Sequence, residues 1–180
     1  MGRCRPVNRL LAQYPQQVKD ILAKYPPEHK RSAVMPLLYL AQGDKMHITR
    51  QDLTDVGEIC GMTETEVESI VGFYTLYHEE PGGKFRIQVC TDLPCALRGA
   101  EEFYAGLCER LGVEDGGTTE DGLITVEQVK CLAACHRAPM LQVQSGHGLD
   151  YHENLTVDLA MEIIDGLRQA ARTEKKEAQA

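Results

Sequence analysis

The stretch that decides the fold is KFRIQVCTDLPCALRG, residues 84–99. Its first half alternates apolar and polar side chains, with the apolar ones at Phe85, Ile87 and Val89. A period of two is typical of a β-strand with one buried face. The strand runs directly into Cys90, and Pro94 favours a turn before Cys95. The sequence therefore predicts a strand that ends in a loop with two cysteines, the first cysteine loop (residues 90–95).

A second pair of cysteines follows another candidate strand, residues 123–129. This pair encloses the second cysteine loop (residues 131–135). Two loops at the same edge of one sheet can bring their thiolates around one centre. The candidate ligands are Cys90, Cys95, Cys131 and Cys135.

Three kinds of site compete for these cysteines. Structural zinc uses tetrahedral sulfur sites, although its cysteine spacings are usually those of zinc fingers and ribbons. A [2Fe–2S] cluster takes four cysteines and tolerates wider spacings. The third possibility is buried, inert cysteines. A dithiol oxidoreductase would need Cys-x-x-Cys, which the chain lacks. Spacing alone favours iron–sulfur and leaves zinc and inert cysteines open.

Composition narrows the class of protein. The chain has 180 residues, 43% of them hydrophobic, and a net charge of −8. That charge argues against a nucleic-acid partner, because phosphate binding needs a basic surface. No apolar run reaches the roughly 20 residues of a membrane span, and no secretory signal is visible. We expect a cytoplasmic protein without direct membrane insertion.

In a reducing compartment the cysteines of this chain are not expected to form structural disulfides. Seven is an odd number, which fits a disulfide framework poorly. Cys60 and Cys108 lie on candidate helices, where we expect small buried hydrophobic side chains. Cys4 belongs to the N-terminal end, where we expect flexibility.

The chain divides near Pro81 into two parts. Helical periods and caps predict a bundle over residues 1–80, with helices over residues 16–24, 29–42 and 49–60 and a fourth that begins at Thr63. Residues 81–171 predict, in order, a strand, a helix, further strands and a final helix. After the first strand, the expected helices span residues 96–111 and 156–167, and the expected strands span residues 123–129, 140–144 and 149–151. Residues 172–180 are charged and alanine-rich, and predict a flexible tail. The predicted fold class is α+β.

Both cysteine loops resemble the motifs of a known family. Residues 89–99 and 131–140 are similar to the two cluster motifs of the thioredoxin-like [2Fe–2S] ferredoxins. Three further segments, residues 62–68, 72–77 and 152–156, resemble the ferredoxin-like subunits of this family in respiratory complex I, the NADH:quinone oxidoreductase. The resemblance implies a thioredoxin-like α/β domain after the bundle. It also implies one [2Fe–2S] cluster per chain on Cys90, Cys95, Cys131 and Cys135.

The resemblance further implies an electron-transfer subunit of an NADH-oxidising enzyme. Single electrons would come from FMN on a partner subunit that binds NADH, and other iron–sulfur subunits would share the complex, peripheral to the inner membrane. The chain carries no Gly-x-Gly-x-x-Gly fingerprint after a strand and no candidate catalytic residues of its own. The alternatives are the equivalent subunit of a soluble NAD-linked formate dehydrogenase or hydrogenase, a free-standing thioredoxin-like ferredoxin, and a zinc-stabilised interaction module.

Some residues near the motifs carry separate expectations. Ala133 stands where the family often has glycine, so a left-handed backbone there would be strained. Arg98 either stabilises the negative charge of a cluster or is a solvated helix residue. His136 is expected to be a surface or supporting residue and not a ligand. An aromatic stripe is expected to pack in the core, at Phe73, Tyr74 and Tyr77. The alternative, which the resemblance implies, is that this stripe docks the helical part against the ferredoxin part or a partner.

Overall fold

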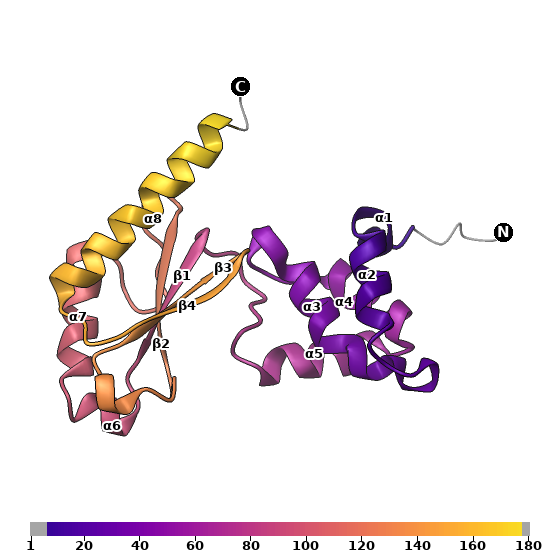
Figure 1. Ribbon diagram of the computed structural model, residues 1–180, viewed down its shortest axis with the longest axis horizontal. Coiled ribbons are helices and arrows are strands. Elements are labelled where there is room, and N and C mark those ends of the chain that lie inside the picture. Colours follow the sequence, from indigo (N-terminus) through magenta and orange to yellow (C-terminus); the bar gives the residue numbers. More distant parts are fainter. Residues whose placement is uncertain (1–6, 178–180) are drawn as a thin grey trace. The chain divides into compact units, whose positions relative to one another are not determined.

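A computed structural model describes residues 7–177 of the chain (Figure 1). The chain forms two compact units, Met1–Pro81 and Gly82–Ala180. The first is helical and the second combines helices with a sheet, which confirms the predicted α+β class. The expectation for Cys4 lies outside the described residues.

Seven helical segments make up the described part of the first unit. They are α1 (Arg9–Gln13), α2 (Pro15–Leu22), the 3₁₀ helix η1 (Pro27–Ala33), α3 (Val34–Gln42), η2 (Gly43–Lys45), α4 (Arg50–Cys60) and α5 (Glu64–Phe73). Capping boxes start two of them, because Thr49 pairs with Asp52 and Thr63 with Glu66. Their apolar faces enclose one core, which includes Leu37, Leu38, Val56 and Val67.

The helix expected over residues 29–42 is shorter than predicted. A 3₁₀ segment occupies residues 27–33, and the α-helix begins only at Val34. Pro36 therefore lies in the first turn of α3, where its missing N–H would have no intrahelical partner.

The aromatic stripe is only partly core, which corrects the expectation. Tyr77 is buried, and its hydroxyl donates to the Met35 carbonyl at 2.9 Å. Phe73 is 78% exposed and Tyr74 is also exposed. Helix α5 ends at Phe73, so Tyr74 and Tyr77 lie beyond the helix and the three rings do not share one helical face.

The second unit is built on a four-stranded sheet (Figure 1). Its elements are β1 (Phe85–Cys90), α6 (Leu93–Ala96), α7 (Ala100–Leu111), β2 (Ile124–Val129), η3 (Cys135–Arg137), β3 (Leu141–Ser145), β4 (Gly148–His152) and α8 (Val157–Glu177). The strand order is β2-β1-β3-β4. Strand β1 is parallel to β2 and antiparallel to β3, and β3 pairs with β4 as an antiparallel hairpin.

One face of the sheet packs against α7 and α8. Its core includes Ile87, Val126, Leu141, Leu107 and Ile164. The alternating pattern of β1 predicted that the other face would be polar and solvated. Instead all six residues of β1 are buried, including Arg86 and Gln88.

Hydrogen bonds between strands explain why polar residues are tolerated on that second face. Gln142 of β3 donates to Gln88 of β1, and Gln88 donates to Glu127 of β2 at 2.7 Å. Arg86 lies 3.6 Å from the same carboxylate. A buried polar group is stable only when it is hydrogen-bonded or paired, and the side chains of Gln142, Gln88 and Glu127 meet that condition across three strands.

Two helix predictions in this unit need correction. The helix expected over residues 96–111 is interrupted, because Gly99 is left-handed with φ 86° and separates α6 from α7. Leu97 lies in that break and is 81% exposed. At the C-terminus, α8 continues to Glu177, so regular helix replaces the expected flexible tail over residues 172–177. Ala171 is buried in the core and Lys84 pairs with Glu174, which holds this end of α8.

Within residues 7–177, no helix is both long and apolar enough to cross a bilayer.

Candidate functional site: two cysteine loops at one sheet edge

The sheet topology brings the two cysteine loops together. Parallel strands end at the same edge of a sheet, and β1 and β2 are parallel neighbours. Cys90 is the last residue of β1 and lies opposite Val129, the last residue of β2. The Thr91 N–H then donates to the Val129 carbonyl at 3.1 Å, which is the final backbone bond between these segments. Both loops therefore leave the sheet from one place.

Three of the four predicted cysteines meet through their side chains. Cys90 and Cys95 are fully buried and in contact with each other, and Cys95 also contacts Cys135. They lie in a small apolar cluster that includes Ala100, Ala134, Ala138 and Met140. This cluster shields the thiols from water on one side.

Cys131 approaches through its backbone. Its side chain is exposed, while its N–H and the Leu132 N–H donate to the sulfur of Cys90. Successive N–H groups that point into one concavity form an anion-binding nest. Cys131 is left-handed with φ 55°, and Ala133 is left-handed with φ 61°. The conformation that the sequence flagged as a strain for alanine is therefore the one that Ala133 adopts.

The thiol pKa values reflect this arrangement. Burial opposes ionisation of Cys90, but N–H groups of Leu132, Asp92 and Cys131 stabilise the thiolate, and the pKa of Cys90 is lowered overall. Burial, together with the neighbouring Cys90 and Cys135 sulfurs, raises the pKa of Cys95 to about 12. The N–H groups thus favour the charged form of Cys90, whereas Cys95 is harder to ionise than an ordinary thiol.

Basic side chains join the loops to each other and to the rest of the unit. Arg98 donates from Nε to the Ala138 carbonyl at 3.4 Å, so it touches the segment after the second loop. Lys130 donates to Thr91, in the first loop, with an Nζ–Oγ1 distance of 2.9 Å. Lys130 is not among the residues predicted from the sequence, although its position directly before Cys131 was a usable signal.

The segment after the second loop is also held by contacts with Glu153 and Asn154. Arg137 pairs with Glu153 at 2.8 Å, and its carbonyl accepts from the Asn154 N–H at 2.7 Å. His136 lies between Cys135 and Arg137 in η3 and is exposed. His136 is therefore a surface residue, as expected from the sequence.

The donor set suits a two-iron cluster. Among the described residues, no three His, Cys, Asp or Glu side chains converge as ligands of a single metal ion. A [2Fe–2S] cluster makes a different demand, since its four cysteine ligands are divided between two irons. Paired thiols, backed by N–H groups that can hydrogen-bond to sulfur, fit this group.

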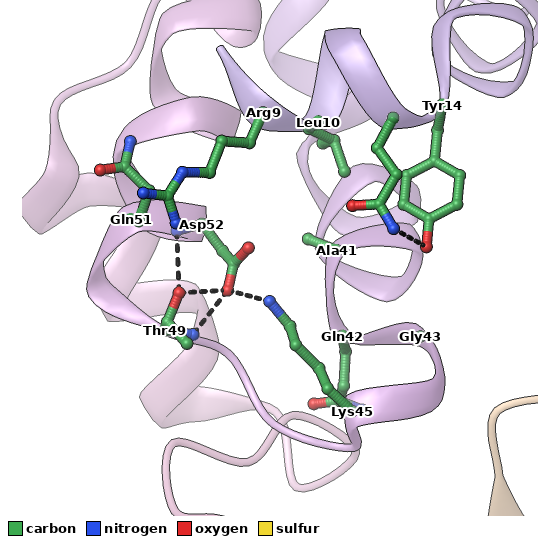
Figure 2. Close-up of a pocket in the computed structure, with 11 residues that line it drawn as sticks. Arg9, Leu10, Tyr14, Ala41, Gln42, Gly43, Lys45, Thr49, Gln51 and Asp52 are labelled. Carbon is green, nitrogen blue, oxygen red and sulfur yellow. Dashed lines mark hydrogen bonds and ion pairs between the residues drawn. The ribbon is translucent and has the colours of Figure 1, made fainter. Parts of the chain in front are cut away.

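A separate pocket lies in the helical unit (Figure 2). Its volume is about 470 Å³, and it lies between α1, the end of α3 and the start of α4. Lys45 and Thr49 project into it beside Asp52. The Asp52 carboxylate is already engaged, because it pairs with Lys45 and accepts from the Thr49 N–H and hydroxyl in the capping box of α4. These groups serve the helix start, and none of the pocket's lining residues is a cysteine.

Comparison with known proteins agrees with the geometry. The thioredoxin-like [2Fe-2S] ferredoxin family matches residues 18–168, which include both cysteine loops. The chain belongs to this family. Subunit 2 of the Thermus thermophilus NADH-quinone oxidoreductase is 39% identical over 89% of this chain and 87% of its own length. An NADH-quinone oxidoreductase subunit from Rhizobium meliloti is 38% identical over 87% of this chain and 90% of its own length.

Other members of the family are longer. The chain covers 61% of an NADH-quinone oxidoreductase subunit from Mycobacterium tuberculosis, which is 36% identical over 88% of this chain. Among solved structures, an NAD⁺-reducing [NiFe]-hydrogenase in its H₂-reduced state has a TM-score of 0.64 at 15% identity over 78% of this chain. This chain spans only 23% of that hydrogenase chain. At this identity the likeness shows a shared fold, and the thioredoxin-like ferredoxin domain predicted from the sequence is confirmed.

Proposed function

We propose that this chain holds one [2Fe–2S] cluster on Cys90, Cys95, Cys131 and Cys135 and transfers single electrons within the NADH-oxidising part of an NADH:quinone oxidoreductase. The observation that carries the proposal is the meeting of the two cysteine loops at the common end of β1 and β2, with N–H groups directed at the Cys90 sulfur. Membership of the ferredoxin family supports the cofactor, and the NADH-quinone oxidoreductase relatives support the enzyme.

The residues of this chain have definite tasks under the proposal. Each loop supplies two thiolates, and the rigid ends of β1 and β2 limit how far the loops can separate. Apolar residues such as Met140 exclude water on the buried side. When bound, the cluster supplies reversible one-electron redox chemistry. N–H donors to sulfur stabilise negative charge and therefore favour the reduced form.

The hydride chemistry belongs to a partner. We propose that a separate FMN-containing subunit binds NADH and passes electrons singly to this chain, and that other iron–sulfur subunits complete the complex. The assembled complex would be cytoplasmic and peripheral to the inner membrane. The fold shared with the NAD⁺-reducing hydrogenase favours a second candidate, the equivalent subunit of a soluble NAD-linked hydrogenase or formate dehydrogenase.

Metal and sulfide analysis of anaerobically purified protein tests the cluster. We expect about two irons and two sulfides per chain, and a spin-half EPR signal after dithionite reduction. Cys95→Ser is expected to lose the signal. Cys108→Ser is the matched control, because Cys108 is a half-buried cysteine on α7 outside both loops. One zinc without sulfide, or equal losses in both variants, would contradict the proposal.

Reduction by NADH tests the partner. With the chain alone, NADH is expected to leave the cluster oxidised. Adding the FMN- and NADH-binding subunit from the same organism should produce the reduced EPR signal. Direct reduction of the isolated chain by NADH would show that the nucleotide site is on this chain after all.

A further inference from the structure

We propose that Lys130 is a positioning residue that ties the two cysteine loops together and raises the reduction potential of the cluster. The inference deepens the proposed function and rests on it. The structure supplies two observations, a hydrogen-bonded link between the loops and a lysine beside them that forms no salt bridge with any residue in the described part of the chain.

The link lies one residue beyond the last backbone hydrogen bond between the segments that follow β1 and β2. That bond runs from the Thr91 N–H to the Val129 carbonyl. One residue farther along, the Lys130 ammonium donates to Thr91 Oγ1 at 2.9 Å and to the Thr91 carbonyl at 3.3 Å. Thr91 directly follows Cys90, and Lys130 directly precedes Cys131. One side chain therefore connects the residue after a cysteine of the first loop with the residue before a cysteine of the second.

Thr91 is a well-placed anchor for this link. It is buried, and its hydroxyl donates to Gln128 Oε1 at 2.9 Å while accepting from Lys130. A hydroxyl that both donates and accepts has one defined orientation, so the position of the ammonium is defined as well. The corresponding contact of Arg98 with the Ala138 carbonyl is longer, at 3.4 Å. Lys130 is therefore the stronger connection between the loops.

The charge of Lys130 remains effective at the site. Both acceptors of its ammonium are uncharged oxygen atoms of Thr91. Arg137, by contrast, is paired with the Glu153 carboxylate. Reduction adds one negative charge to the cluster, and a nearby cation stabilises the state with more negative charge. The ammonium should therefore favour reduction, by an amount that solvent screening limits because Lys130 is an exposed residue.

Four variants separate the charge from the link. Lys130→Met removes both, and Lys130→Arg keeps the charge. Thr91→Val keeps the charge but removes the hydroxyl. Lys84→Met is the matched control, since Lys84 lies just before the opposite end of β1 and forms an exposed pair with Glu174. The readouts are the midpoint potential from an EPR-monitored redox titration and the rate of iron loss to a chelator.

We expect Lys130→Met to lower the equilibrium constant for reduction by about twofold to tenfold, and tenfold corresponds to a shift of 59 mV to more negative potential. Lys130→Arg should keep the midpoint potential of the unmodified protein. Thr91→Val should release iron severalfold faster while changing the potential less than Lys130→Met does. Lys84→Met should match the unmodified protein in both measurements.

Two failures are distinguishable. If Lys130→Met holds its cluster with the same potential and the same rate of iron loss as Lys84→Met, the inference is wrong and the proposed function stands. If the unmodified chain carries no iron and no sulfide, the proposed function fails first. Circular dichroism of each variant checks that the fold is retained.

Discussion

The backbone of the second cysteine loop yields a prediction that goes against the usual effect of glycine. Ala133 has φ 61° and is exposed. A left-handed conformation costs a residue with a Cβ roughly 1–2 kcal/mol, and glycine does not incur this penalty. Glycine is more flexible in the unfolded chain, which costs roughly 0.5–1 kcal/mol. Because the Ala133 methyl group is exposed, little apolar burial is lost. We therefore expect Ala133→Gly to increase the free energy of unfolding by about 0.5–1 kcal/mol.

A matched control has the opposite expected sign. Ala105 is an exposed residue inside α7, where the backbone is right-handed. Ala105→Gly should therefore lower the free energy of unfolding by about 0.5–1 kcal/mol. Urea unfolding of the cluster-free protein, followed by circular dichroism, measures both variants. The relevant transition is that of the second unit, because Ala133 and Ala105 both lie in it.

The reasoning would be refuted if Ala133→Gly destabilised the protein as much as Ala105→Gly does. That result would mean that Ala133 is not left-handed in solution. The anion-binding arrangement of N–H groups around the Cys90 sulfur would then need another explanation, since it depends on the same loop conformation.

Two further predictions concern the helices. The Thr63 N–H, followed by Arg31 and the Thr63 hydroxyl, lowers the pKa of Glu66 from its ordinary 4.5 to about 2. Because the folded pKa is the lower one, this stabilisation is complete above pH 4.5 and is lost as the pH falls towards 2. Glu66→Gln should therefore show a smaller fall in Tm between neutral and acid pH, and an unchanged fall would count against the capping box. Leu107 is fully buried and Leu97 is 81% exposed, so Leu107→Ala should cost about 2–5 kcal/mol and Leu97→Ala less than about 0.5 kcal/mol in chemical denaturation. Similar costs for both leucines would contradict the observed break between α6 and α7.

Much of the local structure could be predicted because its causes are local. The capping boxes that begin at Thr49 and Thr63 involve residues three positions apart, and both stand where the sequence predicts the start of a helix. The alternation in residues 85–89 and the glycines near the ends of helices likewise act within a few residues. The cysteine motifs were sufficient to predict the family, and the match over residues 18–168 confirms it.

The sequence by itself determined the type and approximate place of most helical and strand segments, and the family. Only the tertiary structure decided which candidate positions are buried and which groups meet. Gln88 is buried because partners on β2 and β3, distant in the sequence, satisfy its amide. Lys130 reaches Thr91 because β1 and β2 are parallel neighbours with one particular register. Periodicity reports the preference of one segment, whereas burial and hydrogen bonding depend on which other segments pack against it.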